Sequence, residues 1–261
     1  RARLQRIFKR FPCQGITMVP TRVDILGIPV DCITMDQAVA WAGSRMQFSE
    51  PKTVIAVNPE KIMKAQSDPQ LQRFLRSAGL LIPDGIGVVL ATRLLGLGYS
   101  ERVPGAELMP RLCALASEKG YSVFLFGASP EVNKRAAAKL RNDFPALIIA
   151  GTQHGYVQPA EMPAVLDRIN RAAPDFLFIA LGSPKQELWM STYLPQLRVK
   201  VCQGVGGTFD VLAGRVKRAP WFFRCIHLEW FYRLLSQPSR LLRQTALPRF
   251  AFHILRKRVL G

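Results

Sequence analysis

The sequence lacks the short signatures of several common enzyme and metal-site classes. No G-x-G-x-x-G and no G-x-x-x-x-G-K-[ST] stretch occurs, so a dinucleotide enzyme and a P-loop NTPase both lose support. G-x-S-x-G is absent as well, which argues against an α/β-hydrolase. Because D-x-D is also absent and the three histidines (154, 227 and 253) lie far apart, the sequence predicts no metal site.

Cysteine pairs and long apolar runs are also missing. The five cysteines (13, 32, 113, 202 and 225) include no C-x-x-C, which favours a reducing compartment over a disulfide scaffold or a structural zinc. No run of 18 or more uncharged apolar residues occurs, so we expect no transmembrane helix. The 261 residues are 49% hydrophobic and 21% charged, a composition typical of a folded protein with a substantial core.

Acidic residues are scarce at the two ends of the chain. Residues 1–22 hold six Lys and Arg and no acid, and residues 215–261 hold eleven with a single Glu229. The segment between them has 19 basic and 17 acidic residues, so the net charge of +18 belongs to the ends. We therefore expect a basic N-terminal extension at 1–22, a core at 23–214 and a basic appendage at 215–261 that faces an anionic partner.

Within the core, strand patterns alternate with helix patterns. The strand patterns are short and apolar throughout, as expected for a parallel sheet covered by helices on both faces. Helix starts are marked by the capping-box pattern Thr34-x-x-Gln37 and by Ser129-Pro130. Strands are predicted at 53–58, 79–82, 122–127, 147–151, 176–182 and 199–205, and helices at 35–46, 60–77, 86–95, 105–119, 130–143, 160–172 and 184–195. This alternation predicts an α/β fold, a Rossmann-like parallel-sheet sandwich.

Polar or glycine-rich segments follow the predicted strands. Ligands of open α/β sheets bind at the carboxyl ends of the strands, so we expect these segments to converge on one edge of the sheet. They are Asn58-Pro59-Glu60, Pro83-Asp84-Gly85, Gly127-Ala128-Ser129, His154-Gly155-Tyr156, 182–187 and 204–207. We interpret His154 itself as a turn or packing residue.

Asp84 is a lone carboxylate between an apolar strand pattern and an apolar helix pattern. Burying an unpaired carboxylate costs several kcal/mol or shifts its pKa. The simpler interpretation is an N-cap for the helix predicted at 86–95, because Asp is a favoured cap. The functional interpretation is a general base, since an apolar setting raises the pKa of a carboxyl toward neutrality. The two roles are compatible.

Three other segments have a structural interpretation, and the third of them also has a functional one. Asn58 follows a predicted strand, where a lone Asn is most often a turn former. Gln186 and Lys185 lie at a helix start, where polar residues are usually solvated. The stretch GVGGTFD, with Gly206 and Gly207, is either a tight turn or a place where backbone N–H groups approach a phosphate.

The basic appendage has amphipathic helix patterns, divided at Pro238. On a helical wheel, Arg233, Arg240 and Arg243 fall within an arc of about 80°, and bulky apolar residues fill most of another side. Basic residues interleaved with Trp, Phe and Leu are typical of an interfacial helix on anionic lipid. The structural alternative is an apolar face packed on the core or on a sister subunit. Nucleic acid fits so much bulky aliphatic surface less well.

Seven motifs, in order and covering about residues 23–245, resemble the WecG/TagA/CpsF glycosyltransferase family. They are VNPEK (57–61), PDGIGVV (83–89), ERVPGAELMP (101–110), GTQHGY (151–156), LGSPKQE (181–187), GVGGTFDVLAGRVKRAP (204–220) and LEWFYRLLSQPSR (228–240). The resemblance implies an inverting enzyme that transfers a sugar from a UDP-sugar to a polyprenyl-diphosphate-linked saccharide in bacterial surface polysaccharide synthesis. It implies no metal and no other cofactor.

The resemblance also implies roles for single residues. Asp84 matches the general base, which takes the proton from the acceptor hydroxyl as its oxygen attacks the sugar. The implied substrate contacts are Asn58 and Gln186 on the sugar, Arg102 near the donor diphosphate, Tyr156 in the nucleotide pocket, Gly206 and Gly207 in the glycine motif, and Arg233, Arg240 and Arg243 closing over the leaving UDP.

The donor stays open among N-acetylmannosamine, N-acetylmannosaminuronate and glucuronate. Some members carry Thr where this chain has Ala56. The residues of the LGSPKQE and LLSQPSR motifs favour a uronic acid. The resemblance further implies action at the cytoplasmic face of the bacterial inner membrane. The residues of the tail favour peripheral attachment to an anionic membrane and no nucleic-acid partner, and they predict a homo-oligomer if the tail's apolar face is exposed. The alternatives are a nucleotide-sugar-binding protein without turnover and a basic nucleic-acid-binding module.

Overall fold

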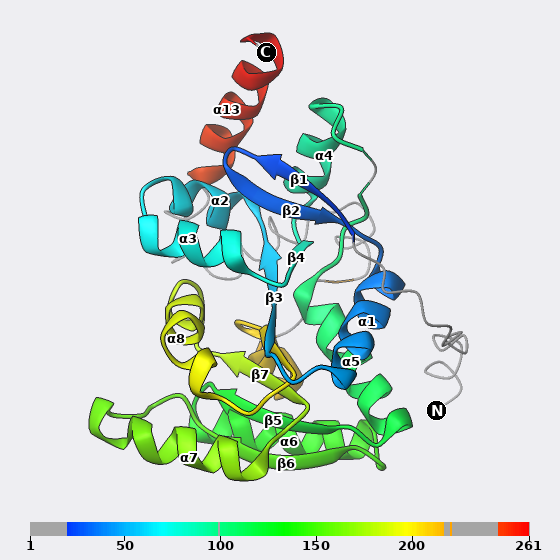
Figure 1. The fold of residues 1–261 in the computed structure, drawn as a ribbon, viewed down its shortest axis with the longest axis vertical. Helices are drawn as coiled ribbons and strands as arrows, with labels where there is room; N and C mark the ends of the chain where they lie inside the picture. The colour runs from blue at the N-terminus through cyan, green and yellow to red at the C-terminus, as the bar shows by residue number, and fades with distance from the viewer. Residues whose placement is uncertain (1–19, 99, 217–219, 221–244, 261) are drawn as a thin grey trace.

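A six-stranded parallel sheet forms the centre of the structure, a computed structural model that describes residues 20–98, 100–216, 220 and 245–260. The strand order is β4-β3-β8-β7-β5-β6, and every neighbouring pair is parallel. The strands are β3 (Lys52–Val57), β4 (Leu80–Pro83), β5 (Ser122–Gly127), β6 (Ile148–Gln153), β7 (Phe176–Ala180) and β8 (Val201–Gly204) (Figure 1). All six predicted strands are confirmed, with ends displaced by at most two residues.

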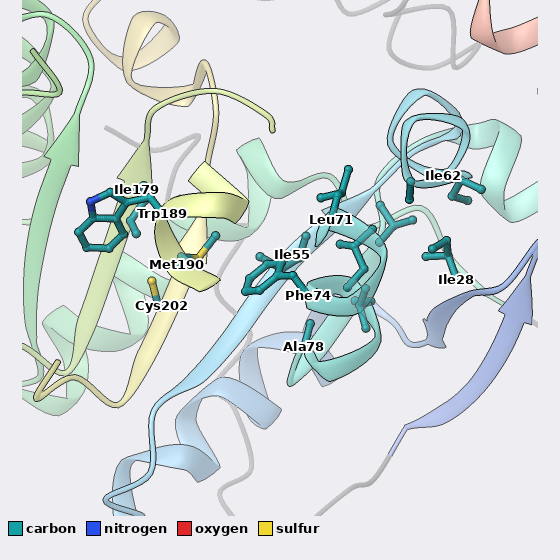
Figure 2. Packing of buried hydrophobic residues seen from close by; sticks show 14 of the residues in the cluster. Ile28, Ile55, Ile62, Leu71, Phe74, Ala78, Ile179, Trp189, Met190 and Cys202 are labelled. Carbon is teal, nitrogen blue, oxygen red and sulfur yellow. The ribbon is translucent and has the colours of Figure 1, made fainter. Parts of the chain in front are cut away.

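Helices cover both faces of this sheet because successive strand side chains point to opposite sides. One face carries α2 (Pro59–Gln66), α3 (Pro69–Ser77), α7 (Met162–Ala172) and α8 (Lys185–Tyr193), and the other α1 (Met35–Ser44), α5 (Gly105–Lys119), α6 (Pro130–Asp143) and α9 (Thr208–Leu212). Figure 2 shows the first face, where Phe74 of α3 lies near Ile55 of β3 and Met190 of α8 near Cys202 of β8. The predicted α/β sandwich is confirmed.

The helix predicted at 60–77 is in fact two helices, α2 and α3. The prediction was wrong because it read through Asp68-Pro69. A proline inside a helix removes a backbone hydrogen bond and clashes with the preceding turn. Pro69 instead begins α3, and the Asp68 side chain caps it by accepting a hydrogen bond of 3.0 Å from the Leu71 N–H.

A β-hairpin precedes the sheet and was not predicted. Strands β1 (Thr21–Ile25) and β2 (Ile28–Cys32) pair antiparallel through a two-residue turn, Leu26-Gly27. Both turn residues have positive φ, +53° and +79°, the conformation of the turn that best fits a two-residue hairpin. β1 begins at Thr21, inside the stretch expected to be a basic extension.

The described end of the appendage is a helix, α13 (Ala246–Leu260). It packs beside α2 and α4 (Ile86–Leu94), at the end of the molecule opposite β6 and α7 (Figure 1). Its Phe250 and Ile254 are buried, so for this part of the appendage an apolar face does pack on the core. Within the described residues, no helix has the length and apolar character needed to cross a bilayer.

Candidate active site

A central cavity of about 630 Å³ lies at the carboxyl ends of β3, β4, β7 and β8. Polar residues that directly follow these strands form its inner part, and α4 and α13 line it farther out. Four of the six segments expected to converge contribute to its lining, namely 58–60, 83–85, 182–187 and 204–207, whereas 127–129 and 154–156 do not. Asp84, Asn58, Arg102, Gln186, Gly206 and Gly207 all line this one cavity.

Asp84 occupies the first position after β4 and is half-buried. Its backbone is fixed from two sides: its N–H donates to the Val57 carbonyl of β3 at 2.9 Å, and its carbonyl accepts from the Arg102 Nε at 3.0 Å. Gly85, not Asp84, is the N-cap of α4, and no side chain caps this helix. The capping interpretation of Asp84 was therefore wrong, since the chain needs one more residue to turn from β4 into α4.

Gly85 explains how Asp84 comes so near the end of β3. A Cβ on Gly85 would lie 3.0 Å from the Cδ of Pro59 and 3.5 Å from the Cβ of Asn58. The starts of α2 and α4 can approach this closely only because that side chain is absent. Asp84 is thereby held beside the segment that carries Asn58.

Asn58 is the N-cap of α2, with Pro59 at the first helical position. Its Oδ1 accepts a hydrogen bond of 2.8 Å from the Lys61 N–H, so its prediction as a turn former is confirmed. Because the cap occupies Oδ1, a bound ligand would meet the Nδ2 group of this side chain.

Gln186 lies on α8 and is buried, so its interpretation as a solvated helix-start residue was wrong, whereas Lys185 beside it is exposed. The Gln186 Oε1 accepts from the Gly206 N–H at 3.0 Å. Gly206 has a left-handed φ of +54° and turns the chain after β8, and Gly207 then caps the five-residue α9. The GVGGTFD stretch is a tight turn, and it forms part of the cavity wall.

Two charged residues at this site were missed by the sequence analysis. Lys61 Nζ and Glu187 Oε1 lie 2.7 Å apart, with their side chains only 6% and 0% exposed. Lys61 also lines the cavity. The signal was present in VNPEK and LGSPKQE, where Lys61 and Glu187 each follow a predicted site residue in the first turn of a helix.

Among the described residues, Tyr156 and His154 do not line the central cavity. Tyr156 follows β6, is 73% exposed, and is absent from the described lining. Arg233, Arg240 and Arg243 lie outside the described residues, so their roles stay predictions. His154 follows β6 too, and its Nδ1 is buried without a hydrogen-bond partner in the described part of the chain.

The charges of the described lining are mixed. Lys61 and Arg102 supply positive charge, and Glu60 and Asp84 supply carboxylates. Within the described ranges, no three His, Cys, Asp or Glu side chains gather in a way that would hold a metal ion. What this arrangement offers chemically is a carboxylate on a fixed backbone, in a cavity that amide and cationic side chains also line. Such a combination suits proton removal beside an anionic substrate group.

Comparison with known proteins identifies the family. Residues 23–261 match the family described as Glycosyl transferase WecG/TagA/CpsF family. The chain belongs to this glycosyltransferase family. The resemblance carried by the seven motifs is therefore confirmed, and the described parts of five of them, 57–61, 83–89, 101–110, 181–187 and 204–216, contribute to the wall of the central cavity.

Three bacterial relatives share the name N-acetylglucosaminyldiphosphoundecaprenol N-acetyl-beta-D-mannosaminyltransferase. The Bacillus spizizenii protein is 38% identical over 203 residues, which cover 78% of both chains. The Bacillus subtilis protein is 38% identical over 205 residues, 78% of this chain and 79% of its own. The Staphylococcus aureus protein is 36% identical over 237 residues, 89% of this chain and 92% of its own.

Proposed function

We propose that this WecG/TagA/CpsF protein transfers N-acetylmannosamine from its UDP derivative to an N-acetylglucosaminyl diphosphate linked to a polyprenyl lipid, with inversion. The observation that carries the proposal is the position of Asp84, fixed at the end of β4 in a cavity whose wall is built from the family motifs. The names of the three relatives support the sugar and the acceptor.

In the proposed reaction, Asp84 accepts the proton of the acceptor hydroxyl. That oxygen forms a new bond to C1 of the sugar while the bond from C1 to the β-phosphate oxygen breaks. UDP leaves with one more negative charge, which Arg102 and the predicted Arg233, Arg240 and Arg243 would neutralise. Guanidinium groups in this role make a metal unnecessary, so we propose a metal-independent reaction.

A neutral donor sugar is favoured over a uronic acid. A uronate carboxylate would need its own cation inside the cavity. The positive charge of Lys61 is already balanced by Glu187 at 2.7 Å, and that of Arg102 is assigned here to the diphosphate. Moreover, all three relatives are named for N-acetylmannosamine. We therefore set aside the leaning toward a uronic acid that the motif wording suggested.

The outer part of the cavity suits the lipid part of the acceptor. Leu90 and Leu94 of α4 and Leu255 of α13 line it and are 47%, 49% and 56% exposed. Next to them on α13 are further exposed apolar and basic residues, namely Phe252, Val259, Arg256, Lys257 and Arg258. A surface with both characters favours an anionic bilayer, so we propose peripheral attachment to the cytoplasmic face of the bacterial membrane.

The test is UDP release from a panel of UDP-sugars, with a lipid-linked N-acetylglucosaminyl diphosphate as acceptor, in detergent with EDTA. We expect release with UDP-N-acetylmannosamine alone. In D84N, kcat should fall by about 10² to 10⁴-fold, the usual contribution of a general base, while the Kd for UDP changes less than about threefold. The matched control is D167N, because Asp167 is exposed on α7 and no residue of α7 is among those that line the cavity.

Each alternative predicts a different experimental result. Full activity in D84N would refute the assignment of the base. UDP binding without release from any donor and acceptor would favour a nucleotide-sugar-binding protein. A nucleic-acid-binding module would instead bind DNA or RNA with a steep salt dependence and ignore lipid vesicles.

A further inference from the structure

Lys61 and Glu187 form a bridge across the carboxyl end of β8. Lys61 belongs to α2, which follows β3, and Glu187 belongs to α8, which follows β7. In the sheet, β8 lies between β3 and β7. The bridge therefore ties the two helices that flank the inner part of the central cavity, over 126 positions of sequence.

Stability alone does not account for this bridge. The free energy needed to take two charges out of water is about as large as the free energy of their attraction. A protein in which apolar residues of similar volume replace a buried ion pair is therefore often as stable as the original. The second carboxylate oxygen, Glu187 Oε2, is buried and has no hydrogen-bond partner in the described part of the chain, which adds to that cost. A pair with so large a desolvation cost, of which Lys61 lines the cavity, points to a role in positioning a neighbouring side chain.

That neighbour is the carboxamide of Gln186. Its Nε2 donates to Glu187 Oε1 at 3.0 Å, and its Oε1 accepts from the Gly206 N–H at 3.0 Å. A carboxylate can only accept and a backbone N–H can only donate. Only one orientation of the amide satisfies both partners, so the charge on Glu187 decides which end of Gln186 faces which way.

The shape of the site reinforces this orientation. A Cβ on Gly204 would lie 2.6 Å from the Gln186 Nε2 and 3.1 Å from its Cδ. The amide thus rests directly on the backbone of β8, with no room for a side chain beneath it. Its plane is set by the β8 backbone and its direction by Glu187 and Gly206.

We propose that Lys61 and Glu187 are positioning residues that hold the Gln186 carboxamide so that its Nε2 presents a hydrogen-bond donor to the sugar of the bound donor substrate. Lys61 holds the Glu187 carboxylate in place through the 2.7 Å contact, Glu187 holds Nε2, and the Gly206 amide holds Oε1. This inference rests on the proposed function for the identity of the substrate, and on the contacts above for the orientation of the amide.

The kinetic test is a double-mutant cycle between Glu187 and Gln186. E187D keeps the charge that pairs with Lys61 but withdraws the carboxylate by one methylene from the Gln186 Nε2. We expect E187D to lower kcat/KM for the UDP-sugar by about 10- to 100-fold, the effect of a displaced positioning group. In a Q186A background the same change should cost less than about twofold, because the residue it acts through is gone. The matched control is E131D, which shortens the carboxylate of an exposed ion pair to Arg135 on α6.

Equal losses from E187D in both backgrounds would overturn the proposal, since a purely structural role of the ion pair does not depend on Gln186. So would an unchanged kcat/KM in the single variant. If the fold of E187D were impaired, K61R would replace it in the cycle, because it also keeps the charges while changing the geometry of the bridge.

A second readout does not depend on the reaction. The side-chain amide protons of Gln186, identified by their loss in Q186A, should exchange with solvent at least about tenfold more slowly than those of the exposed Gln158. E187D should remove most of this protection. Rapid exchange in the wild-type chain would overturn the orientation, whereas slow exchange in a chain that transfers no sugar would show that only the proposed function is wrong.

Discussion

Replacing Asp31 by Asn tests how the β1–β2 hairpin is held against the sheet. Asp31 is fully buried, and its two oxygens accept hydrogen bonds from Arg22 Nε at 2.8 Å and Arg22 Nη2 at 2.9 Å. One of them, Oδ2, also accepts from the Leu81 N–H of β4 at 2.7 Å. The same guanidinium donates to the carbonyls of Ala78 and Gly79, so one ion pair joins the hairpin to the edge of the sheet.

The expected loss follows from the exposure of the two partners. Breaking a buried ion pair by removing one charge costs about 3–5 kcal/mol, because the other charge is left without a partner. Here the Arg22 side chain is 37% exposed and can regain part of its hydration, while the Asp31 side chain is 1% exposed. Asn also retains one oxygen to accept from Leu81. We therefore expect the lower end of that range, a loss of about 3 kcal/mol in the free energy of unfolding.

Urea unfolding followed by circular dichroism measures this loss in the free energy of unfolding. Thermal unfolding should show a decrease in Tm of about 6–12 °C for a domain of this size. The control is D36N, because Asp36 pairs with Arg111 at 2.7 Å but is 73% exposed. An exposed pair contributes at most about 1 kcal/mol, so D36N should change little. A loss below about 1 kcal/mol in D31N, or equal losses in both variants, would refute the reasoning that burial sets the value of these pairs.

Two further perturbations test the packing of the sheet. G127A should lower the free energy of unfolding by more than about 2 kcal/mol, because φ is +119° there and the new Cβ would lie 2.5 Å from the Ala180 carbonyl oxygen. Urea unfolding would measure this loss. A midpoint equal to that of the wild type would contradict the prediction. Burial raises the pKa of the Cys113 and Cys202 thiols, and burial together with nearby Asp31 raises that of Cys32. Mass spectrometry of iodoacetamide-treated native protein at pH 8 should therefore find Cys113 and Cys202 unlabelled, and Cys32 labelled slowly but faster as the pH rises. Since folding favours the protonated thiols, stability should be complete below the ordinary thiol pKa of 9.0 and fall as the pH rises above it, and a rise in that range would contradict the assignment.

The fold was predictable from the sequence where one strong local signal determined each element. The runs TVIAV and SVFLFG are mostly apolar on both faces, as expected for strands of a covered parallel sheet, and both form interior strands. The strand order was not predictable, because it depends on which helix faces fit which strand faces. The hairpin was missed for a related reason: β1 reads TRVDI, which is short and mostly polar. Besides the burial of Ile25, it is held by the Arg22–Asp31 pair, which no local pattern predicts.

The candidate site was predictable to the extent that the carboxyl ends of parallel strands must meet. Asn58 and Asp84 follow neighbouring strands, β3 and β4, and that adjacency alone brings them together. Gln186 reaches the same cavity from α8 for the same topological reason. Tyr156 follows β6 at the far edge of the sheet, and the same logic explains why it is not in the described lining.

Lys61 and Glu187 show where prediction from a single sequence ends. Each lies in the first turn of a helix, where a charged side chain is ordinarily solvated, and neither position carries a sign of burial on its own. They are 126 residues apart, and the pairing exists only because β8 enters the sheet between β3 and β7 and brings α2 and α8 together. What the sequence does allow is a weaker inference. A lysine three positions after a site asparagine and a glutamate directly after a site glutamine have opposite charges, and two such residues carried to one cavity must neutralise each other if they are buried there.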